Sequence, residues 1–393
     1  MKSPIAECLV LVMPERLPLA GWARAGMLER YWAVFRLLRA EYGRLVVVTP
    51  GGEDERSVLA AVDGATTEFV LASAGHPPGA VVQSVVRAVG GAGSVVVRTV
   101  QIAGCSLGID ITRGLRQSGR AVGLIARTGF VWSKFVALED GPHAPRAIEA
   151  AQREGALCRA ADIVAGTTQR ILDDLSWRYG LDPARCAVVP NYVLVDHPAM
   201  EPVERDAHSV LTVGPLVKRR RVDLLVRASA GLADSEARLT VVGDGPEAGA
   251  LRALAVSLSA PVDFVPHATH AEVLARLTRC AVYVQASMLE GHPTNVLDAM
   301  ACGAAVIVTE SQGLGFVVHH GVSGLRVAPD EAAISHAMRD MLADPDWREI
   351  LGASAARITR TNFGLPEVFA QEVDVHRRVV RLGAEHGVLR KSA

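Results

Sequence analysis

The stretch at residues 287–309 sets the strongest constraint on the fold of this 393-residue chain. It reads SMLEGHPTNVLDAMACGAAVIVT, and apolar strand candidates lie at 281–286 and 304–308. Between them the pattern predicts a turn at 290–293 and a helix at 294–302. A strand, a turn, a helix and a second strand in this order are typical of a parallel α/β sheet.

The same stretch predicts an anion-binding site. Thr294 or Asn295 can cap the helix, and Gly303 can end it. The amides at such a helix N-terminus point, with partial positive charge, at any ligand above the sheet edge. We therefore expect a phosphate there. Glu290 and Asp298 would then bind hydroxyl groups on either side of it.

Strand and helix candidates alternate along most of the chain, beginning with an apolar strand at 8–13. A stretch without periodicity at 191–205 interrupts this alternation, which restarts with a strand at 210–213. The chain is also long for a single domain. We predict two doubly wound α/β domains at 1–195 and 206–364, followed by a C-terminal helix in 365–393.

Composition and charge exclude several classes of partner. The net charge of −1 at pH 7 gives no long-range attraction to nucleic acid or to an acidic membrane surface. The six cysteines are scattered without a Cys-x-x-Cys pair, which favours a reducing cytoplasm. No apolar run approaches the ~20 residues that cross a bilayer. We expect a cytoplasmic protein without an integral membrane segment, as a monomer or homodimer.

Four consecutive cations, Lys218 to Arg221, follow the strand at 210–213 and precede a helix candidate. Guanidinium groups bind phosphate oxygens in pairs, so this loop suits a pyrophosphate. A solvated charge run is the alternative. A later turn, Gly243-Asp244-Gly245-Pro246, follows another strand and requires a positive φ at glycine.

The segment EGHPTNVLDAMACGAAVIVT resembles the signature of retaining nucleotide-sugar glycosyltransferases of the GT-B fold. It looks like the large family 4 group that includes bacterial mannosyl-, glucosyl- and N-acetylglucosaminyltransferases. That signature has two acidic residues separated by seven positions and then an Ala-Met-Ala-x-Gly helix end. Glu290 matches the first acid, and Asp298 stands where the family usually has glutamate. The resemblance covers nearly all of 210–327 and is looser before it.

The resemblance implies a fold and an activity. Two Rossmann-like domains would face a central cleft, with the acceptor in 1–195, the nucleotide sugar in 206–364 and the helix in 365–393 packing back on the first domain. The chain would transfer a sugar to a hydroxyl acceptor, with retention and without a metal, by front-face displacement. No cofactor is implied beyond the nucleotide sugar, for which UDP is favoured over GDP. Secondary metabolites and cell-envelope glycans are the candidate acceptors, and a soluble one is favoured.

Site residues follow from the same resemblance. Glu290, Arg220 and Arg127 would be catalytic. Donor binding would fall to Gly214, Lys218, Arg219, Gly243, Gly291, His292, Pro293, Thr294, Asn295 and Asp298. Acceptor binding would fall to Gly21, in a loop expected at 14–26, and to Gln101 and Trp132. A salt-bridged Arg127, a buried Trp132 and a carboxylate of Asp298 on the helix surface are the alternatives.

Three residues depart from the family pattern around the donor: Pro215 replaces arginine, Asp298 replaces glutamate, and Phe316 replaces glutamate. They indicate either an unusual donor or a weakened relative that acts as a binding or partner subunit. A dinucleotide-dependent oxidoreductase would need a Gly-x-Gly-x-x-Gly turn after a strand, and none occurs in that context. The pair His319-His320 has no third ligand nearby in the sequence, so we predict a surface pair and no metal.

Overall fold

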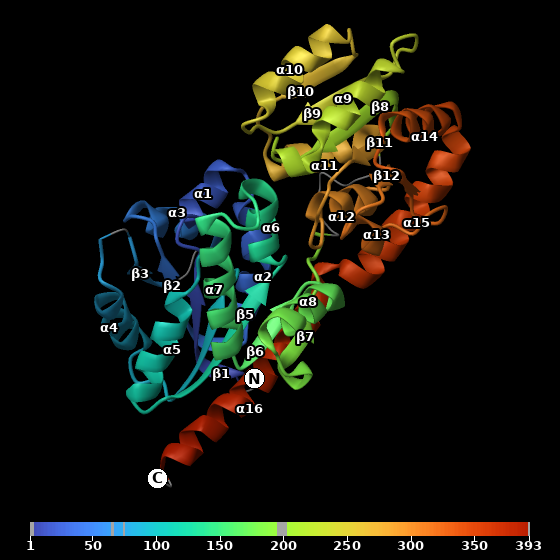
Figure 1. The fold of residues 1–393 in the computed structure, drawn as a ribbon. Helices are drawn as coiled ribbons and strands as arrows, with labels where there is room; N and C mark the ends of the chain where they lie inside the picture. The colour runs from blue at the N-terminus through green and yellow to red at the C-terminus, as the bar shows by residue number, and fades with distance from the viewer. Residues whose placement is uncertain (1–3, 64–66, 74, 195–202, 392–393) are drawn as a thin grey trace. The chain divides into compact units, whose positions relative to one another are not determined.

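The computed structural model describes residues 4–63, 67–73, 75–194 and 203–391, and the middle of the linker expected at 191–205 lies outside them. The chain divides into two compact units. Unit 1 consists of Met1–Pro190 and Val368–Ala393, and unit 2 of Asn191–Glu367. Each unit is described by itself, with the element labels of Figure 1.

Unit 1 is built on a seven-stranded parallel sheet in the order β3-β2-β1-β4-β5-β6-β7. The strands are β1 (Ala6–Val12), β2 (Tyr42–Thr49), β3 (Glu68–Leu71), β4 (Ser94–Thr99), β5 (Ala121–Thr128), β6 (Ile163–Gly166) and β7 (Cys186–Val188). The helices are α1 (Leu19–Arg24), α2 (Leu28–Ala40), α3 (Asp54–Asp63), α4 (Pro78–Val89), α5 (Leu107–Gln117), α6 (Trp132–Asp140), α7 (Pro145–Ala160) and α8 (Gln169–Tyr179), with a 3-10 turn at Pro183–Arg185. The central strands are apolar on both faces because helices cover both, and Val10, Val97 and Leu124 are fully buried.

The last helix, α16 (Leu365–Lys391), belongs to unit 1 from Val368 onward. Figure 1 shows its red ribbon beside the sheet of unit 1. It packs on β5 at Gly123, where an added Cβ would lie 2.5 Å from the carbonyl oxygen of Val379. Glycine at this position therefore permits the close approach of the helix to the strand.

Unit 2 is built on a six-stranded parallel sheet in the order β10-β9-β8-β11-β12-β13. The strands are β8 (Asp206–Val213), β9 (Arg238–Val242), β10 (Val262–Val265), β11 (Cys280–Gln285), β12 (Ala305–Thr309) and β13 (Leu325–Val327). The helices are α9 (Val222–Ala230), α10 (Ala248–Ser257), α11 (His270–Arg279), α12 (Thr294–Ala301), α13 (Leu314–Val317), α14 (Glu331–Ala343) and α15 (Pro345–Phe363), with a 3-10 turn at Lys218–Arg220. Two parallel sheets with alternating helices confirm the predicted α/β class.

One expected loop is a helix. Residues 14–26 were predicted to be irregular, but Leu19–Arg24 form α1, which contains Gly21. The carboxylate of Glu55, fully buried, accepts hydrogen bonds from the backbone amides of Leu19 and Ala20 at 2.8 Å. The cap of α1 thus comes from a residue 35 positions away, which a local pattern does not reveal.

Each sheet has one point where the direction of winding reverses. In unit 1 it lies between β1 and β4, and in unit 2 between β8 and β11. At such a point the loops that follow the two strands diverge and leave room at the carboxyl edge of the sheet, where α/β proteins bind ligands. Both candidate sites lie at these positions.

Candidate functional site

The site in unit 2 is formed by the loops that follow β8 and β11. Glu290, after β11, accepts hydrogen bonds at Oε1 from Nη1 of Arg220 at 2.7 Å and from Nη1 of Arg219 at 3.3 Å. The side-chain amide of Gln285 donates to the same oxygen at 3.3 Å. Two guanidinium groups thus share one carboxylate, and the cluster carries one net positive charge. The carboxylate and both guanidinium groups are 15% exposed or less.

Backbone contacts fix the position of Glu290. Its amide donates to the carbonyl of Gln312 at 2.8 Å, and the amide of Met288 donates to the carbonyl of Arg219 at 2.8 Å. Gly313 has a φ of 100°, and an added Cβ there would lie 2.2 Å from the carbonyl oxygen of Glu290. The loop after β12 therefore packs tightly against the acidic residue.

Glycines hold the basic loop against its neighbours. Gly214 has a φ of 144°, and a Cβ there would lie 2.1 Å from Nη2 of Arg220. Gly243 has a φ of 140°, and a Cβ there would lie 2.0 Å from the carbonyl oxygen of Gly214. The positive φ predicted for the turn after β9 is confirmed. Lys218 is exposed and Arg219 half-buried, so the four cations of the loop differ in environment.

Helix α12 begins beside this cluster. Its N-cap is Pro293, and neither Thr294 nor Asn295 caps it, because Thr294 is already the first helical residue and the side-chain amide of Asn295 donates to the carbonyl of Val213 at 2.8 Å. The predicted side-chain cap was wrong. The helix N-terminus has no side-chain cap, which leaves its first amides for another acceptor.

His292 supports the turn from within. Its Nδ1 accepts a hydrogen bond from the amide of Asn191 at 3.0 Å, and its carbonyl accepts one from the Asn191 side chain at 2.7 Å. The ring is buried and lies edge-on to Phe363, with centroids 5.0 Å apart. The His292 side chain thus holds the turn in place. The backbone of residues 291–294 remains the part of the turn that suits a nucleotide sugar.

Asp298 is not the exposed helix carboxylate that one alternative predicted. It is 2% exposed and lies 3.2 Å from Nε2 of His270, the first residue of α11. The side chain is thus buried within unit 2 against α11, and ribose binding by Asp298 stays a prediction. Phe316 is 52% exposed, with its ring centroid 6.4 Å from that of His292.

Unit 1 has a pocket of about 370 Å³ at its own switch point. It is lined by Pro14, Glu15, Arg16 and Leu17 after β1, by Ala103 and Gly104 after β4, and by Trp132, Val136, Arg146, Glu149, Ala150 and Arg153 of α6 and α7. Of the residues predicted to bind an acceptor, Trp132 lines this pocket. Gln101 does not, and its Oε1 accepts from the amide of Gly129 at 3.1 Å. Gly21 lies in α1 against Pro18 and Leu17.

Arg127 has internal partners in place of the predicted substrate contact. It is 7% exposed, and its guanidinium donates to Glu372 at 3.4 Å and to the carbonyl of Pro190 at 3.3 Å. Arg98 reaches the same Glu372 oxygen at 2.8 Å. Burial alone would raise the pKa of Glu372, but Arg98, Arg127 and His376 outweigh it and lower the pKa to about 2. We therefore assign Arg127 a structural role, as its salt-bridged alternative predicted.

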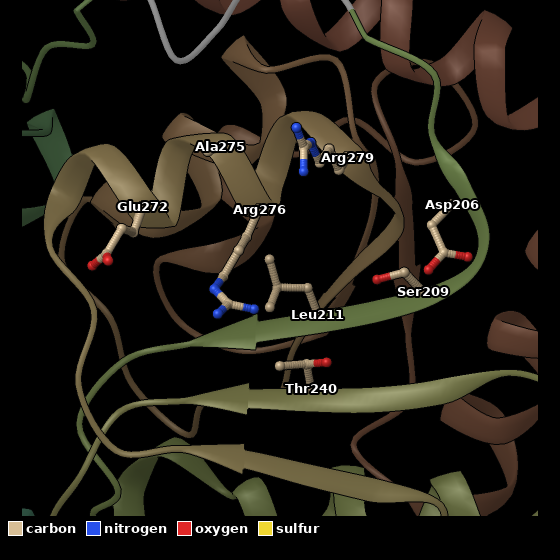
Figure 2. A pocket seen from close by; sticks show the side chains of 8 residues that line it. All are labelled: Asp206, Ser209, Leu211, Thr240, Glu272, Ala275, Arg276 and Arg279. Carbon is tan, nitrogen blue, oxygen red and sulfur yellow. The ribbon is translucent and has the colours of Figure 1, made fainter.

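Unit 2 has a hollow of about 530 Å³ between helix α11 and the strands β8 and β9. Figure 2 shows Arg276 extending from α11 toward the strands, beside Leu211 and Thr240. Its acids already have partners: Glu272 accepts from Thr269 in the cap of α11, and Asp206 accepts from the amide of His208. None of the residues that line this hollow belongs to the cluster around Glu290.

Two further properties concern the described residues only. They contain no group of three or more His, Cys, Asp or Glu side chains arranged to hold a metal ion. None of the described helices is both long enough and apolar enough to span a bilayer.

Comparisons with known proteins bear on the family and on the fold. Residues 198–358 match the family described as glycosyl transferases group 1. A D-inositol 3-phosphate glycosyltransferase of Streptomyces bingchenggensis is 29% identical over 247 residues, which span 56% of this chain and 54% of the relative. One of the same name from Kineococcus radiotolerans is 30% identical over 287 residues, 65% of this chain and 66% of the relative. The chain spans about half the length of the first of these curated relatives.

Among solved structures, Anabaena HepE in complex with UDP and glucose has a TM-score of 0.73 at 14% identity, covering 93% of this chain and 98% of that one. At this identity the likeness shows the fold, which is GT-B. The chain contains a glycosyltransferase group 1 domain, and the resemblance read from residues 290–309 is confirmed.

Proposed function

We propose that the protein is a retaining glycosyltransferase that moves a sugar from a nucleoside-diphosphate donor to a hydroxyl group of an acceptor. The donor binds unit 2 and the acceptor binds unit 1. One observation carries the proposal: Arg219, Arg220 and Glu290 meet at the switch point of unit 2, inside the segment that matches the family. Paired guanidinium groups beside a helix N-terminus suit a diphosphate.

The cluster supplies what a departing diphosphate needs. Two guanidinium groups oppose one carboxylate, and the uncapped N-terminus of α12 adds partial positive charge. In the proposed step the bond between the anomeric carbon and the diphosphate oxygen breaks. The acceptor oxygen bonds to the same face of that carbon, and its proton passes to the departing diphosphate.

Glu290 acts on the sugar in this proposal. Its Oε1 already accepts from Arg219, Arg220 and Gln285, so Oε2 is the atom that accepts from sugar hydroxyls. Because arginine and helix amides oppose the diphosphate charge, we expect transfer to continue in the presence of EDTA. UDP is the first nucleotide to test, and UDP is what HepE, which shares the fold, was solved with.

Thermal shift with UDP, GDP, ADP and dTDP tests the donor site. A ligand at about 100 times its dissociation constant stabilises the folded state by about 2.7 kcal/mol, a shift that is readily measured. We expect one nucleotide to produce this shift and Arg220→Gln to abolish it. Arg227→Gln, an exposed cation on α9, is the matched control and should leave the shift unchanged.

Glu290→Gln separates catalysis from binding. The substitution keeps the shape of the side chain and adds one unit of positive charge to the cluster, so nucleotide binding should be unchanged or tighter. Release of the nucleoside diphosphate from the donor sugar should fall at least 100-fold, because hydroxyl recognition in the transition state is lost. Unchanged release would refute the role of Glu290.

The exposed Phe316 and the buried Asp298 favour a second candidate, a weakened relative that binds without transfer. The same series decides between the two. No shift with any nucleotide at millimolar concentration, together with no nucleotide release, would support a binding or partner subunit.

A further inference from the structure

We propose that Asn191 and His292 are positioning residues that connect the nucleotide-binding turn of unit 2 to the segments through which the chain passes between its two units. A nucleotide bound at the turn therefore restrains those segments. The inference rests on the proposed function, because it takes the backbone of residues 291–294 as part of the nucleotide site. Each contact that carries it lies within a single unit.

The chain passes between the units twice, after Pro190 and after Glu367. Close to these points unit 2 has two short segments, 191–193 and 363–365, which we call the crossing segments. The amide and the carbonyl of Val193 each make a backbone hydrogen bond to the second segment, at 2.8 and 3.1 Å. Val193 is also fully buried. The two passages of the chain thus meet in one hydrogen-bonded element.

Asn191 and His292 attach the turn to this element. The side-chain amide of Asn191 donates to the carbonyl of His292 at 2.7 Å, and its backbone amide donates to Nδ1 of the ring at 3.0 Å. Because a backbone amide only donates, this contact requires Nδ1 without a proton. The buried ring also lies edge-on to Phe363 in the second segment, with centroids 5.0 Å apart. His292 therefore contacts both crossing segments.

The peptide group between Pro190 and Asn191, where the chain leaves unit 1, is held at both ends. Its N–H donates to His292, and its carbonyl accepts from the guanidinium of Arg127 at 3.3 Å. Arg127 belongs in turn to the buried cluster around Glu372. A peptide group is planar and rigid, so its two ends move together. The position of the turn is therefore coupled to the position of this peptide.

The turn is the part of this arrangement that a nucleotide would order. Its amides lie at the N-terminus of α12, which has no side-chain cap, so a diphosphate bound there would fix the backbone on either side of His292. Ordering one partner of a hydrogen bond favours the bond, and such coupling is reciprocal. Loosening Asn191 or the His292 ring should therefore weaken nucleotide binding, although the contacts that are lost lie behind the turn.

Hydrogen exchange followed by mass spectrometry tests this coupling on the full chain, with UDP, GDP, ADP and dTDP each at millimolar concentration. A hydrogen-bonded amide exchanges only when its segment opens. We expect the nucleotide that gives the thermal shift to slow exchange at 291–297. We also expect it to slow exchange by about fivefold or more in peptides that cover 191–193 and 363–365.

Variants of the two residues locate the coupling. His292→Phe keeps an aromatic ring but removes the acceptor; it should keep the protection of 291–297, lose that of the crossing segments and bind the nucleotide about fivefold more weakly. His292→Asn, whose side-chain oxygen can take the place of Nδ1, should restore the protection. Asn191→Ala should also lower it, whereas Asn362→Ala, which removes an exposed asparagine of α15, should behave like the wild type. A purely structural role would lower stability without a response to nucleotide.

The outcomes separate this inference from the proposed function. Protection of 291–297 alone in the wild type would overturn the inference and leave the proposed function standing. Equal protection of the crossing segments in the wild type and in His292→Phe would do the same. No thermal shift and no protection with any of the four nucleotides would overturn the proposed function, and this inference with it.

Discussion

The buried cluster around Glu372 gives the sharpest prediction about stability. Glu372, on α16, accepts from Arg98 of β4 at 2.8 Å and from Arg127 of β5 at 3.4 Å through one oxygen. His376, one turn later on α16, is fully buried, and its Nδ1 lies 2.5 Å from the hydroxyl oxygen of Tyr42. Glu372→Gln would keep the size of the side chain but leave two buried guanidinium groups without a counter-charge.

Two arguments give the same magnitude. The ordinary pKa of 4.5 and the folded-state pKa of about 2 differ by an amount that corresponds to about 3 kcal/mol of stability at neutral pH. Breaking a buried ion pair by removing one partner costs about 3–5 kcal/mol. For a unit of this size, a loss of about 3 kcal/mol lowers the melting temperature by about 6–12 °C.

Urea unfolding followed by tryptophan fluorescence measures this loss, because four of the five tryptophans lie in unit 1. Asp374→Asn, an exposed acid on the same helix, is the matched control and should change stability by less than about 0.5 kcal/mol. The folded-state pKa of Glu372 is depressed, so the gap between wild type and Glu372→Gln is complete above pH 4.5 and narrows as the pH falls toward 2. A gap below about 1 kcal/mol at pH 7 would refute the buried ion cluster.

Three further predictions follow from backbone and burial. Gly243→Ala should destabilise unit 2 by about 3 kcal/mol or more, because the added Cβ would lie 2.0 Å from a carbonyl oxygen. Gly249→Ala, in open space on α10, should stabilise unit 2 by up to about 1 kcal/mol. Urea unfolding of both variants measures the two changes. Arg221 has a φ of 48°, a left-handed conformation that favours glycine and disfavours β-branched residues. In thermal unfolding, Arg221→Gly should be at least as stable as Arg221→Ala, and Arg221→Val should be about 1 kcal/mol less stable than Arg221→Ala. At pH 8 an aromatic disulfide reagent should react quickly with one thiol per native chain, and Cys186→Ser should remove that reaction, because Cys186 alone among the six cysteines is not buried.

The fold was predictable because its determinants are local. Apolar strands of four to eight residues, glycine turns and helix stripes recur along the chain, and each is visible within a short window. The positive φ of Gly243 belongs to the same class, since a strand-to-helix turn of this sequence requires it. The ion pair between Arg220 and Glu290, 70 positions apart, was not predicted, although both residues were expected at the site of the nucleotide sugar.

The contacts that the sequence did not indicate share a physical cause, because each joins side chains that lie far apart along the chain. The cap of α1 comes from Glu55, Arg127 pairs with a residue 245 positions away, and Asp298 pairs with His270 on another helix. A buried polar side chain takes whichever partner the packed core supplies. Sequence spacing identifies the residue type that can carry a function, but it does not show whether a core partner has already taken that side chain.

The two sites differ in how the chain encodes them, and this explains why one was predicted in detail and the other only through Trp132. In unit 2, a single loop after β11 carries the acid, the turn and the start of α12, so the signature is contiguous. In unit 1, loops after β1 and β4 and two helices each contribute a few side chains to the pocket, and no stretch contains enough of them to form a motif. A nucleoside diphosphate is a shared ligand that one loop can bind through its backbone, whereas an individual acceptor is recognised by side chains gathered from several loops. If the proposed function holds, the residues that decide acceptor choice should therefore be sought outside the segment that matches the family, starting with Trp132 in the pocket of unit 1.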